Sequence, residues 1–437
     1  MAAPVPPLKP RHYAKPAGLV RRTHRDASRD ELRARGLRTA LTQELLEARP
    51  SQPRLVSTAE GAFARLLLTI PSYAVEAPEL AAIYAGLLRT LPKPTALVVL
   101  THESVAATIA SWLKKARRRK GDVIVTAPDH LVFSVWAEDG YCASAEGAHT
   151  YLVEPYAFPR YGDGLIAELV SNATDLRKSQ APLYFQGGNV LIGDDFFFIG
   201  ADYPAESLAY VGDVLAPAPG ESPADLVRRL YSEYLDTGRR LIYVGSTVPV
   251  PAERVRKIAV DGEPWTEVLH AGNDKGTAQP IFHIDMFVTL AGRGPTGAYR
   301  ALVGDPAMAA DFMGERVRPH AMREAFDSIA AGLGRLGFEV TRNPMPLVYV
   351  DDPEVRERFW YFATANNALV SVSPRDGDHV WLPTYAYGEW TSLAPVDRRN
   401  QEIWEAMGFT AHLLPDCHPL ASALGAVHCV KKYLARR

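Results

Sequence analysis

Cysteine is scarce in this sequence, with three among 437 residues. An odd and sparse set argues against a disulfide framework and is typical of a reducing compartment. No apolar run approaches the length of about 18 residues that predicts a membrane span. Residues 1–7 lack the apolar core of a secretory signal. These absences disfavour a disulfide-stapled or membrane-spanning protein and predict a cytoplasmic one.

An excess of charge of one sign is missing as well. The net charge is -2, which provides no overall attraction to nucleic acid or to an anionic membrane. The shares of hydrophobic residues, 47%, and charged residues, 22%, are ordinary for a soluble globular protein. We therefore expect no nucleic-acid or membrane partner. The pattern leaves the oligomeric state open, a homo-oligomer included.

Residues 1–60 differ in composition from the rest of the chain. They contain twelve Lys and Arg against six Asp and Glu, and five prolines lie in the first twenty residues. A basic arm can attract anionic partners, but a solvated extension that packs one leucine face on the body is the favoured interpretation. We expect a basic, Pro-rich, partly helical extension over residues 1–60 and a single folded domain over residues 61–437.

The predicted elements of the body follow a repeating rhythm. Two or three short strands accompany each helix, as in the strands at 95–101 and 123–126 on either side of a helix at 104–118. A doubly wound sheet would alternate strands and helices one to one. The rhythm predicts an α/β fold with a closed, repeated β-β-α-β arrangement, strands near the axis and helices outside.

The tail of the sequence places a thiol beside an imidazole, at His428 and Cys429. A cysteine attacks as the thiolate, and positive charge nearby lowers its pKa. His428, Lys431 and Lys432 could supply that charge. The alternative is a buried structural cysteine in a final strand over residues 426–430, because free cysteine behaves as a small hydrophobe.

Two turn-like stretches carry polar residues after apolar runs. A predicted strand at 131–136 leads into Asp139 and a glycine, which can be plain turn chemistry or a functional carboxylate. Gln186 precedes the turn Gly187-Gly188-Asn189, where glycine permits a sharp bend or close approach of a ligand. No helix or phosphate-loop lysine follows this turn, so a phosphate cradle is excluded.

A predicted strand at 281–290 carries His283 and Asp285 two positions apart. Alternate residues of a strand point to one face, so both side chains would share it. An imidazole and a carboxylate among apolar neighbours are costly unless used or paired, which favours function. No further His or Cys stands at ligand spacing, so a metal site is disfavoured.

Together these stretches resemble the guanidino-group-modifying superfamily, which includes agmatine deiminase, arginine deiminase, protein-arginine deiminase and the amidinotransferases. The resemblance runs from about residue 60 to the end. The matching motifs are Trp136-x-x-Asp139, Gly187-Gly188-Asn189, His283-x-Asp285 and Gly425-x-x-His428-Cys429. The resemblance implies a five-bladed α/β propeller of β-β-α-β modules around a central active site.

The resemblance also implies roles for these residues. Asp139 and Asp285 would hold the substrate guanidinium, Cys429 would attack its central carbon, and His283 would transfer protons. Trp136, Gly188 and Asn189 would line the substrate site. No metal or organic cofactor is implied. Relatives carry Glu before the glycine pair where this chain has Gln186, which would support His283 as a neutral amide. Residues 423–426 are bulkier than in many relatives, and His428 is interpreted as a local strand residue.

The predicted function is therefore a cysteine-dependent hydrolase, a deiminase of a small guanidino compound such as arginine or a derivative. It would proceed through a thiouronium-type intermediate and release ammonia and a ureido product. An amidinotransferase, a non-catalytic guanidino-binding protein and a thiol protease are the alternatives. The rest of the substrate is left open. Arg293, Arg342 and Arg375 are loop candidates for binding a carboxylate, although each is more typical of ordinary surface charge.

Overall fold

The computed structural model describes residues 49–118, 121–211, 216–250, 254–269 and 278–437. Residues 1–48 of the predicted N-terminal extension lie outside this range. The residues that follow them join the body, because β1 (Arg54–Leu55) pairs antiparallel with β5 (Cys142–Glu146). No helix of the described segments has the length and apolar character needed to cross a membrane.

The described strands form six sheets, and five of these share one connection pattern. In one of them β8 (Val190–Ile192) runs antiparallel to β9 (Phe196–Gly200), and β9 runs parallel to β10 (Arg240–Val244). A parallel pair requires a crossover connection. Here α6 (Asp202–Val211) and α7 (Pro223–Tyr234) provide it.

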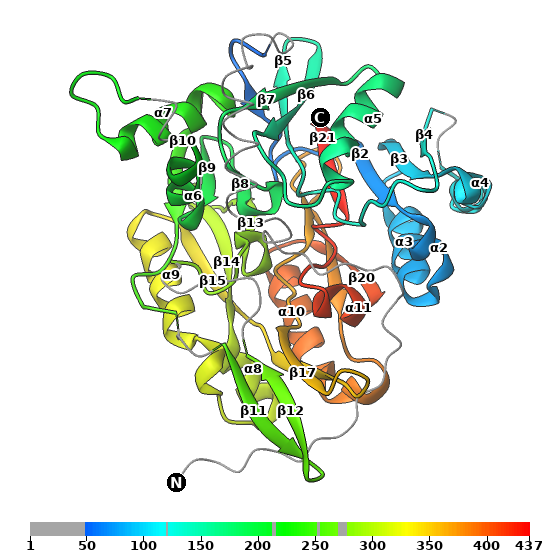
Figure 1. Ribbon diagram of the computed structural model, residues 1–437, viewed down its shortest axis with the longest axis vertical. Coiled ribbons are helices and arrows are strands. Elements are labelled where there is room, and N and C mark those ends of the chain that lie inside the picture. Colours follow the sequence, from blue (N-terminus) through cyan, green and yellow to red (C-terminus); the bar gives the residue numbers. More distant parts are fainter. Residues whose placement is uncertain (1–48, 119–120, 212–215, 251–253, 270–277) are drawn as a thin grey trace.

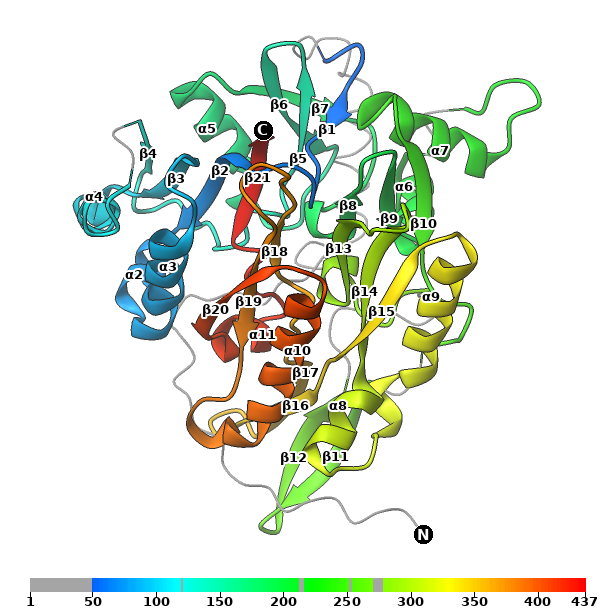
Figure 2. The same ribbon diagram turned by 180° about the vertical axis from the view of Figure 1, so that it is seen from behind.

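The other four sheets repeat this pattern around the molecule, with helices toward the outside (Figures 1 and 2). Their remaining strands are β6 (His149–Pro155) and β7 (Arg177–Ala181); β13 (Val288–Arg293), β14 (Tyr299–Asp305) and β15 (Glu339–Pro344); β18 (Leu369–Ser371), β19 (His379–Thr384) and β20 (Thr410–Asp416); and β21 (Lys431–Arg436), β2 (Phe63–Ile70), β3 (Ala96–His102) and β4 (Val123–Ala127). Their helices are α2 (Ser72–Glu76), α3 (Pro78–Thr90), α4 (Ala106–Lys115), α5 (Ile166–Ala173), α8 (Pro306–Met313), α9 (Arg323–Arg335) and α10 (Ala394–Ala406). The last strand, β21, pairs antiparallel with β2, so the two ends of the body meet in one sheet.

The sixth sheet lies apart from this pattern. It contains β11 (Val255–Val260), β12 (Glu263–Val268), β17 (Glu357–Phe362) and β16 (Leu347–Asp352), in that order. The β11–β12 hairpin projects from the body at the bottom of Figure 1.

A capping residue precedes an amphipathic run in α7. Ser222 caps its first turn by accepting a hydrogen bond from the Asp225 amide, and Pro223 supplies a preset backbone angle at the first helical position. Such a cap contributes about 1 kcal/mol. Leu226 and Leu230, four positions apart, are buried on one face of the helix. The helix predicted at 104–118 lies close to the observed α4, in which Ile109 and Leu113 are buried on one face.

Two predicted strands are wrong and a third is wrong in part, and each of them carries predicted site residues. Residues 131–136 are irregular, and residues 426–430 form a turn before β21 begins at Lys431. In the third stretch the 3-10 turn η5 (Ile284–Met286) precedes β13, so His283 and Asp285 do not share a strand face. These side chains therefore project from irregular segments and turns, not from strands.

Candidate active site

Cys429 lies in a buried loop between α11 (His418–Ser422) and β21. Leu424 adopts a left-handed backbone conformation, φ 67°, where this loop begins. The next residue, Gly425, has no room for a side chain, because an added Cβ would lie 2.4 Å from the Trp136 ring. Trp136 is itself buried, so its ring is one wall that fixes the path of the cysteine loop.

Asn367, which no sequence pattern indicated, holds the cysteine loop in place. Its Oδ1 accepts hydrogen bonds from the backbone amides of Ala426, at 3.0 Å, and Cys429, at 3.3 Å. The same oxygen lies 3.2 Å from Cys429 Sγ. Its Nδ2 donates to the main-chain carbonyl of Asp285 at 3.3 Å. One buried amide therefore joins the thiol to the loop that carries a predicted substrate carboxylate.

The Asp285 carboxylate lies between the thiol and His428. Its Oδ2 is 3.6 Å from Cys429 Sγ and 2.9 Å from His428 Nδ1. Burial and the nearby Lys431 lower the pKa of His428, so this imidazole is neutral at pH 7. A carboxylate can only accept, so Nδ1 carries the proton. The interpretation of His428 as a local strand residue is wrong, because it lies in a turn and orients Asp285.

His283 presents both ring nitrogens to polar groups. Nε2 lies 2.6 Å from the Tyr203 hydroxyl, and Nδ1 lies 3.8 Å from Asp139 Oδ1. All three side chains are buried. Tyr203, in α6, had no signal in the sequence. The structure thus brings His283 and Asp139 together from segments more than a hundred residues apart.

Side-chain amides replace a strand ladder around His283. Gln279 Nε2 donates to the carbonyls of Ile281, at 3.3 Å, and Phe282, at 3.1 Å. Asn189 Oδ1 accepts from the Ile284 amide at 2.9 Å and from Gln279 Nε2 at the same distance. This network satisfies backbone groups that a neighbouring strand would otherwise have to pair. The contact of Asn189 with substrate stays a prediction.

Gln186 and Gly188 lie in the chain segment that also carries Asn189. The Gln186 amide donates to the Tyr184 hydroxyl at 3.1 Å, and its Oε1 finds no hydrogen-bond partner among the described residues. Tyr203 makes the short contact with the His283 ring, so support of that ring by Gln186 stays a prediction. Gly188 is buried in the 3-10 turn η4 (Gly187–Asn189), and its contact with substrate also stays a prediction.

Asp139 already binds a guanidinium, that of Arg160. Arg160 Nη2 lies 2.8 Å from Asp139 Oδ2, and its Nε lies 2.5 Å from Asp163 Oδ2. Burial opposes the charge of Arg160, but Asp163 and Asp139 outweigh burial and raise its pKa, so the side chain remains a cation. The sequence did not point to Arg160. Its position shows that the Asp139 carboxylate can accept a guanidinium nitrogen.

Glu138 links the loop that carries Asp139 to the chain segment that carries Cys429. Its carboxylate lies 2.7 Å from Lys431 Nζ and 2.9 Å from Lys432 Nζ, and its amide donates to the Cys429 carbonyl at 3.1 Å. Burial favours the neutral acid, but the two lysines outweigh it and lower the pKa of Glu138. Gly187 packs so closely that an added Cβ would lie 1.9 Å from the Glu138 carbonyl oxygen. The lysines predicted to activate the thiol thus pair directly with Glu138.

Replacing Glu138 by glutamine is expected to destabilise the protein by about 3–5 kcal/mol, because two buried ammonium groups lose their counterion. The folded pKa of Glu138 lies below its ordinary value of 4.5, so its stabilisation is present above that pH and disappears as the pH falls through the folded value. Urea unfolding should therefore separate Glu138→Gln from wild type strongly at pH 7 and weakly in acid. Glu168→Gln, which breaks the half-exposed pair with Lys178, should cost less than about 1 kcal/mol. Equal losses in the two variants would contradict this assignment.

Replacing Asn367 by aspartate is expected to slow alkylation of Cys429 by iodoacetamide at least about tenfold at pH 7.5, because a negative charge would lie beside Sγ and disfavour the thiolate. Peptide mass spectrometry measures the rate at each cysteine. Asn172→Asp, on an exposed helix position, is the charge-matched control. An alkylation rate that is the same in both variants would show that Asn367 does not act on the thiol.

Among the residues that the structure describes, the buried charges around these loops leave an excess of one negative charge. Four carboxylates face three cations before Cys429 and the histidines are counted: Asp139, Asp163, Asp285 and Glu138 against Arg160, Lys431 and Lys432. The site is therefore suited to a cation. Within the described segments no group of three or more His, Cys, Asp or Glu side chains is arranged to hold a metal ion.

The fold is that of the guanidino-group-modifying enzymes. A crystal structure assigned as an agmatine deiminase matches with a TM-score of 0.58 and 11% identity, over 90% of this chain and 99% of that one. The agmatine deiminases of Enterococcus faecalis and C. jejuni match with TM-scores of 0.54 and 0.53, each with 10% identity over 90% of this chain and 99% of theirs. No protein-family model and no curated protein sequence matches the chain. The resemblance drawn from the motifs is confirmed at the level of the fold.

Proposed function

We propose that this chain, which has the fold of the guanidino-group-modifying enzymes, is a cysteine-dependent hydrolase of a guanidino compound. The observation that carries the proposal is the buried group in which Cys429 Sγ lies 3.6 Å from Asp285 and His283 lies 3.8 Å from Asp139. The five sheets with a shared pattern would be the blades of a propeller around this group. The agmatine deiminases of the same fold are consistent with this chemistry.

Binding would depend on the two carboxylates. A guanidinium is planar and cationic, and carboxylates hold it through charge-assisted hydrogen bonds. Asp139 accepts such a bond from Arg160, at 2.8 Å, and Asp285 lies beside the thiol. A substrate guanidinium held by both would place its central carbon near Cys429 and contribute the positive charge that favours the thiolate.

In the first half-reaction the thiol proton passes to His283 and Sγ forms a bond to the central carbon. In this tetrahedral adduct the carbon is bonded to Sγ, to the two terminal nitrogens and to the nitrogen that carries the substituent. His283 returns the proton to one terminal nitrogen, whose bond to carbon breaks as ammonia leaves. The product of this step is a thiouronium-type cation in which Cys429 carries the substrate less ammonia.

In the second half-reaction water adds to the same carbon while His283 accepts its proton. The carbon–sulfur bond breaks, and the thiol is restored with the proton from His283. The remaining hydroxyl proton passes through solvent to the released ammonia. Guanidinium and water have then become a ureido compound and ammonium. Every proton transfer in this scheme passes through His283 or solvent.

Product analysis on a substrate panel tests the proposal. Arginine, agmatine, methylated arginines and guanidino acids are incubated with the protein, with and without glycine as an acceptor amine. We expect ammonia and a ureido product in equal amounts without acceptor. Transfer of the amidino group to glycine without ammonia would identify an amidinotransferase instead. Binding without any product would identify a guanidino-binding protein.

A further inference from the structure

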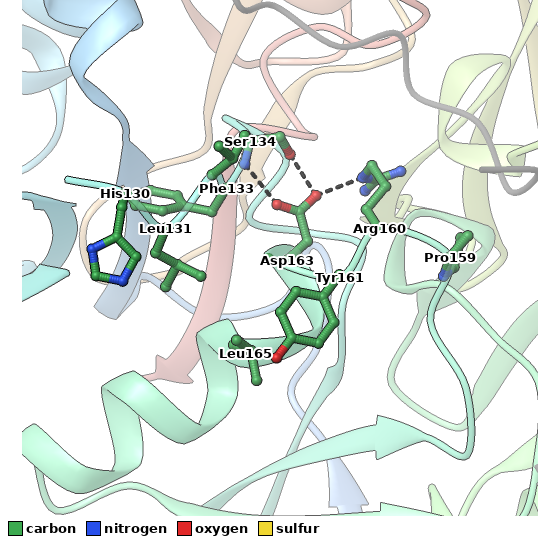
Figure 3. A pocket seen from close by; sticks show the side chains of 11 residues that line it. His130, Leu131, Phe133, Ser134, Pro159, Arg160, Tyr161, Asp163 and Leu165 are labelled. Carbon is green, nitrogen blue, oxygen red and sulfur yellow. Dashed lines mark hydrogen bonds and ion pairs between the residues drawn. The ribbon is translucent and has the colours of Figure 1, made fainter. Parts of the chain in front are cut away.

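A pocket of about 670 Å³ opens between the segments 130–134 and 159–165 (Figure 3). Its volume lies within the range of about 300–1,000 Å³ that small-molecule sites occupy. Leu131, Phe133, Tyr161 and Leu165 provide apolar and aromatic walls. The proposed reaction makes no use of these side chains.

The polar groups at the floor of the pocket are engaged with one another. The Ser134 amide and hydroxyl both donate to the Asp163 carboxylate, each at 2.6 Å, and Arg160 Nε donates to it at 2.5 Å. Figure 3 shows these contacts converging on Asp163. The pocket therefore offers a ligand apolar contact more than ionic contact.

The rim of the pocket is unusually apolar for a protein surface. Val132 is 73% exposed and Tyr161 is 71% exposed, and no other large hydrophobic residue of the described segments is as exposed. Both line this pocket. Single exposed apolar residues are normal, but exposed apolar side chains gathered at a pocket mark a binding surface.

Arg160 connects the pocket to the candidate active site. Its side chain lines the pocket and reaches Asp139 at 2.8 Å, and Asp139 lies 3.8 Å from His283. One side chain thus separates the apolar pocket from the carboxylate proposed to hold the substrate. Arg160 itself shows that a side chain whose guanidinium lies on Asp139 can also line this pocket.

We propose that this pocket receives an uncharged, apolar substituent of the guanidino substrate. The inference rests on the proposed function, because it places the guanidinium on Asp139. It defines the substrate class as a guanidine with an alkyl or aryl substituent, rather than one that ends in an amine or a carboxylate. Four apolar walls and a self-paired polar floor favour such a group.

A series of n-alkylguanidines, from methyl to hexyl, tests the inference by titration calorimetry. The full chain carries Cys429→Ala so that no turnover occurs during the titration. We expect affinity to rise roughly two- to fourfold with each added methylene, since each buried methylene stabilises by up to about 0.8 kcal/mol. Butylguanidine should bind more tightly than agmatine, which carries an amine on the same four carbons. Tyr161→Ser and Leu131→Ser should flatten the series while leaving methylguanidine unchanged. Val355→Ser, at an exposed apolar residue away from the pocket, should leave the series as it is.

Two results would overturn the inference. One is a flat series in which methylguanidine and hexylguanidine bind equally. The other is a rising series that Tyr161→Ser and Leu131→Ser do not change. Either result, with guanidinium itself still binding and Asp139→Asn weakening it, would leave the proposed function intact. Absence of guanidinium binding would remove both.

Discussion

Replacing Cys429 by alanine is expected to abolish ammonia release from every guanidino substrate while binding persists. The variant lacks the only protein atom in the proposed scheme that forms a bond to the central carbon, and loss of a covalent nucleophile costs about 10⁴-fold or more in kcat. Binding should remain within about threefold, because the carboxylates that hold the guanidinium are kept. Ammonia release and titration calorimetry on the same preparation measure the two effects.

The other two cysteines provide matched controls. Burial raises the pKa of Cys142 to about 11 and also raises the pKa of Cys417, so neither thiol is suited to act as a nucleophile near neutral pH. Cys142→Ala and Cys417→Ala should retain turnover. If either loses turnover while remaining folded, and Cys429→Ala keeps it, the assignment of the nucleophile is wrong.

Replacing His283 by glutamine is expected to lower kcat by about 10²–10⁴-fold, the range that a positioned acid–base group contributes. The imidazole lies between the Tyr203 hydroxyl, at 2.6 Å, and Asp139, at 3.8 Å, so a group that transfers protons is held against the carboxylate that would bind substrate. Glutamine keeps a polar contact with Tyr203 but cannot exchange a proton at neutral pH. Initial-rate kinetics separate kcat, which should fall, from KM, which should change little.

Two variants control for a structural effect of the His283 change. Tyr203→Phe removes the contact at Nε2, and we expect a smaller loss of kcat with a displaced pH profile, because the ring remains but is less firmly oriented. His428→Gln removes the imidazole whose Nδ1 lies 2.9 Å from the Asp285 carboxylate. A complete loss in His428→Gln together with near-normal turnover in His283→Gln would reverse the two roles.

Which side chains lie near one another could be predicted from the sequence better than the backbone that carries them. Cys429, His283 and the two aspartates stand out because reactive side chains follow apolar runs in a characteristic order. The strand predicted at 281–290 is wrong over residues 281–287, where Gln279 and Asn189 bond the backbone, and residues 288–290 lie in β13. No periodicity of apolar residues carries information about such long-range side-chain bonds.

The site residues that the sequence did not indicate all contact residues that are distant from them in the sequence. Tyr203 contacts a residue 80 positions away, and Asn367 contacts Cys429 across 62 positions. Arg160, likewise, is a common residue in an irregular segment, and only its 2.8 Å contact with Asp139 distinguishes it. The helix at 104–118 was easier to predict, because amphipathic spacing acts within a few positions of the chain.

Mass spectrometry of the acid-quenched reaction tests the central claim most directly. The protein is mixed with its best guanidino substrate, quenched within the first turnover and digested. We predict that the peptide containing Cys429 gains the mass of the substrate less ammonia, and that this species decays as the ureido product forms. A gain of the amidino group alone would indicate amidino transfer. The absence of any adduct on Cys429 during turnover, or an adduct on Cys142 or Cys417, would contradict the account.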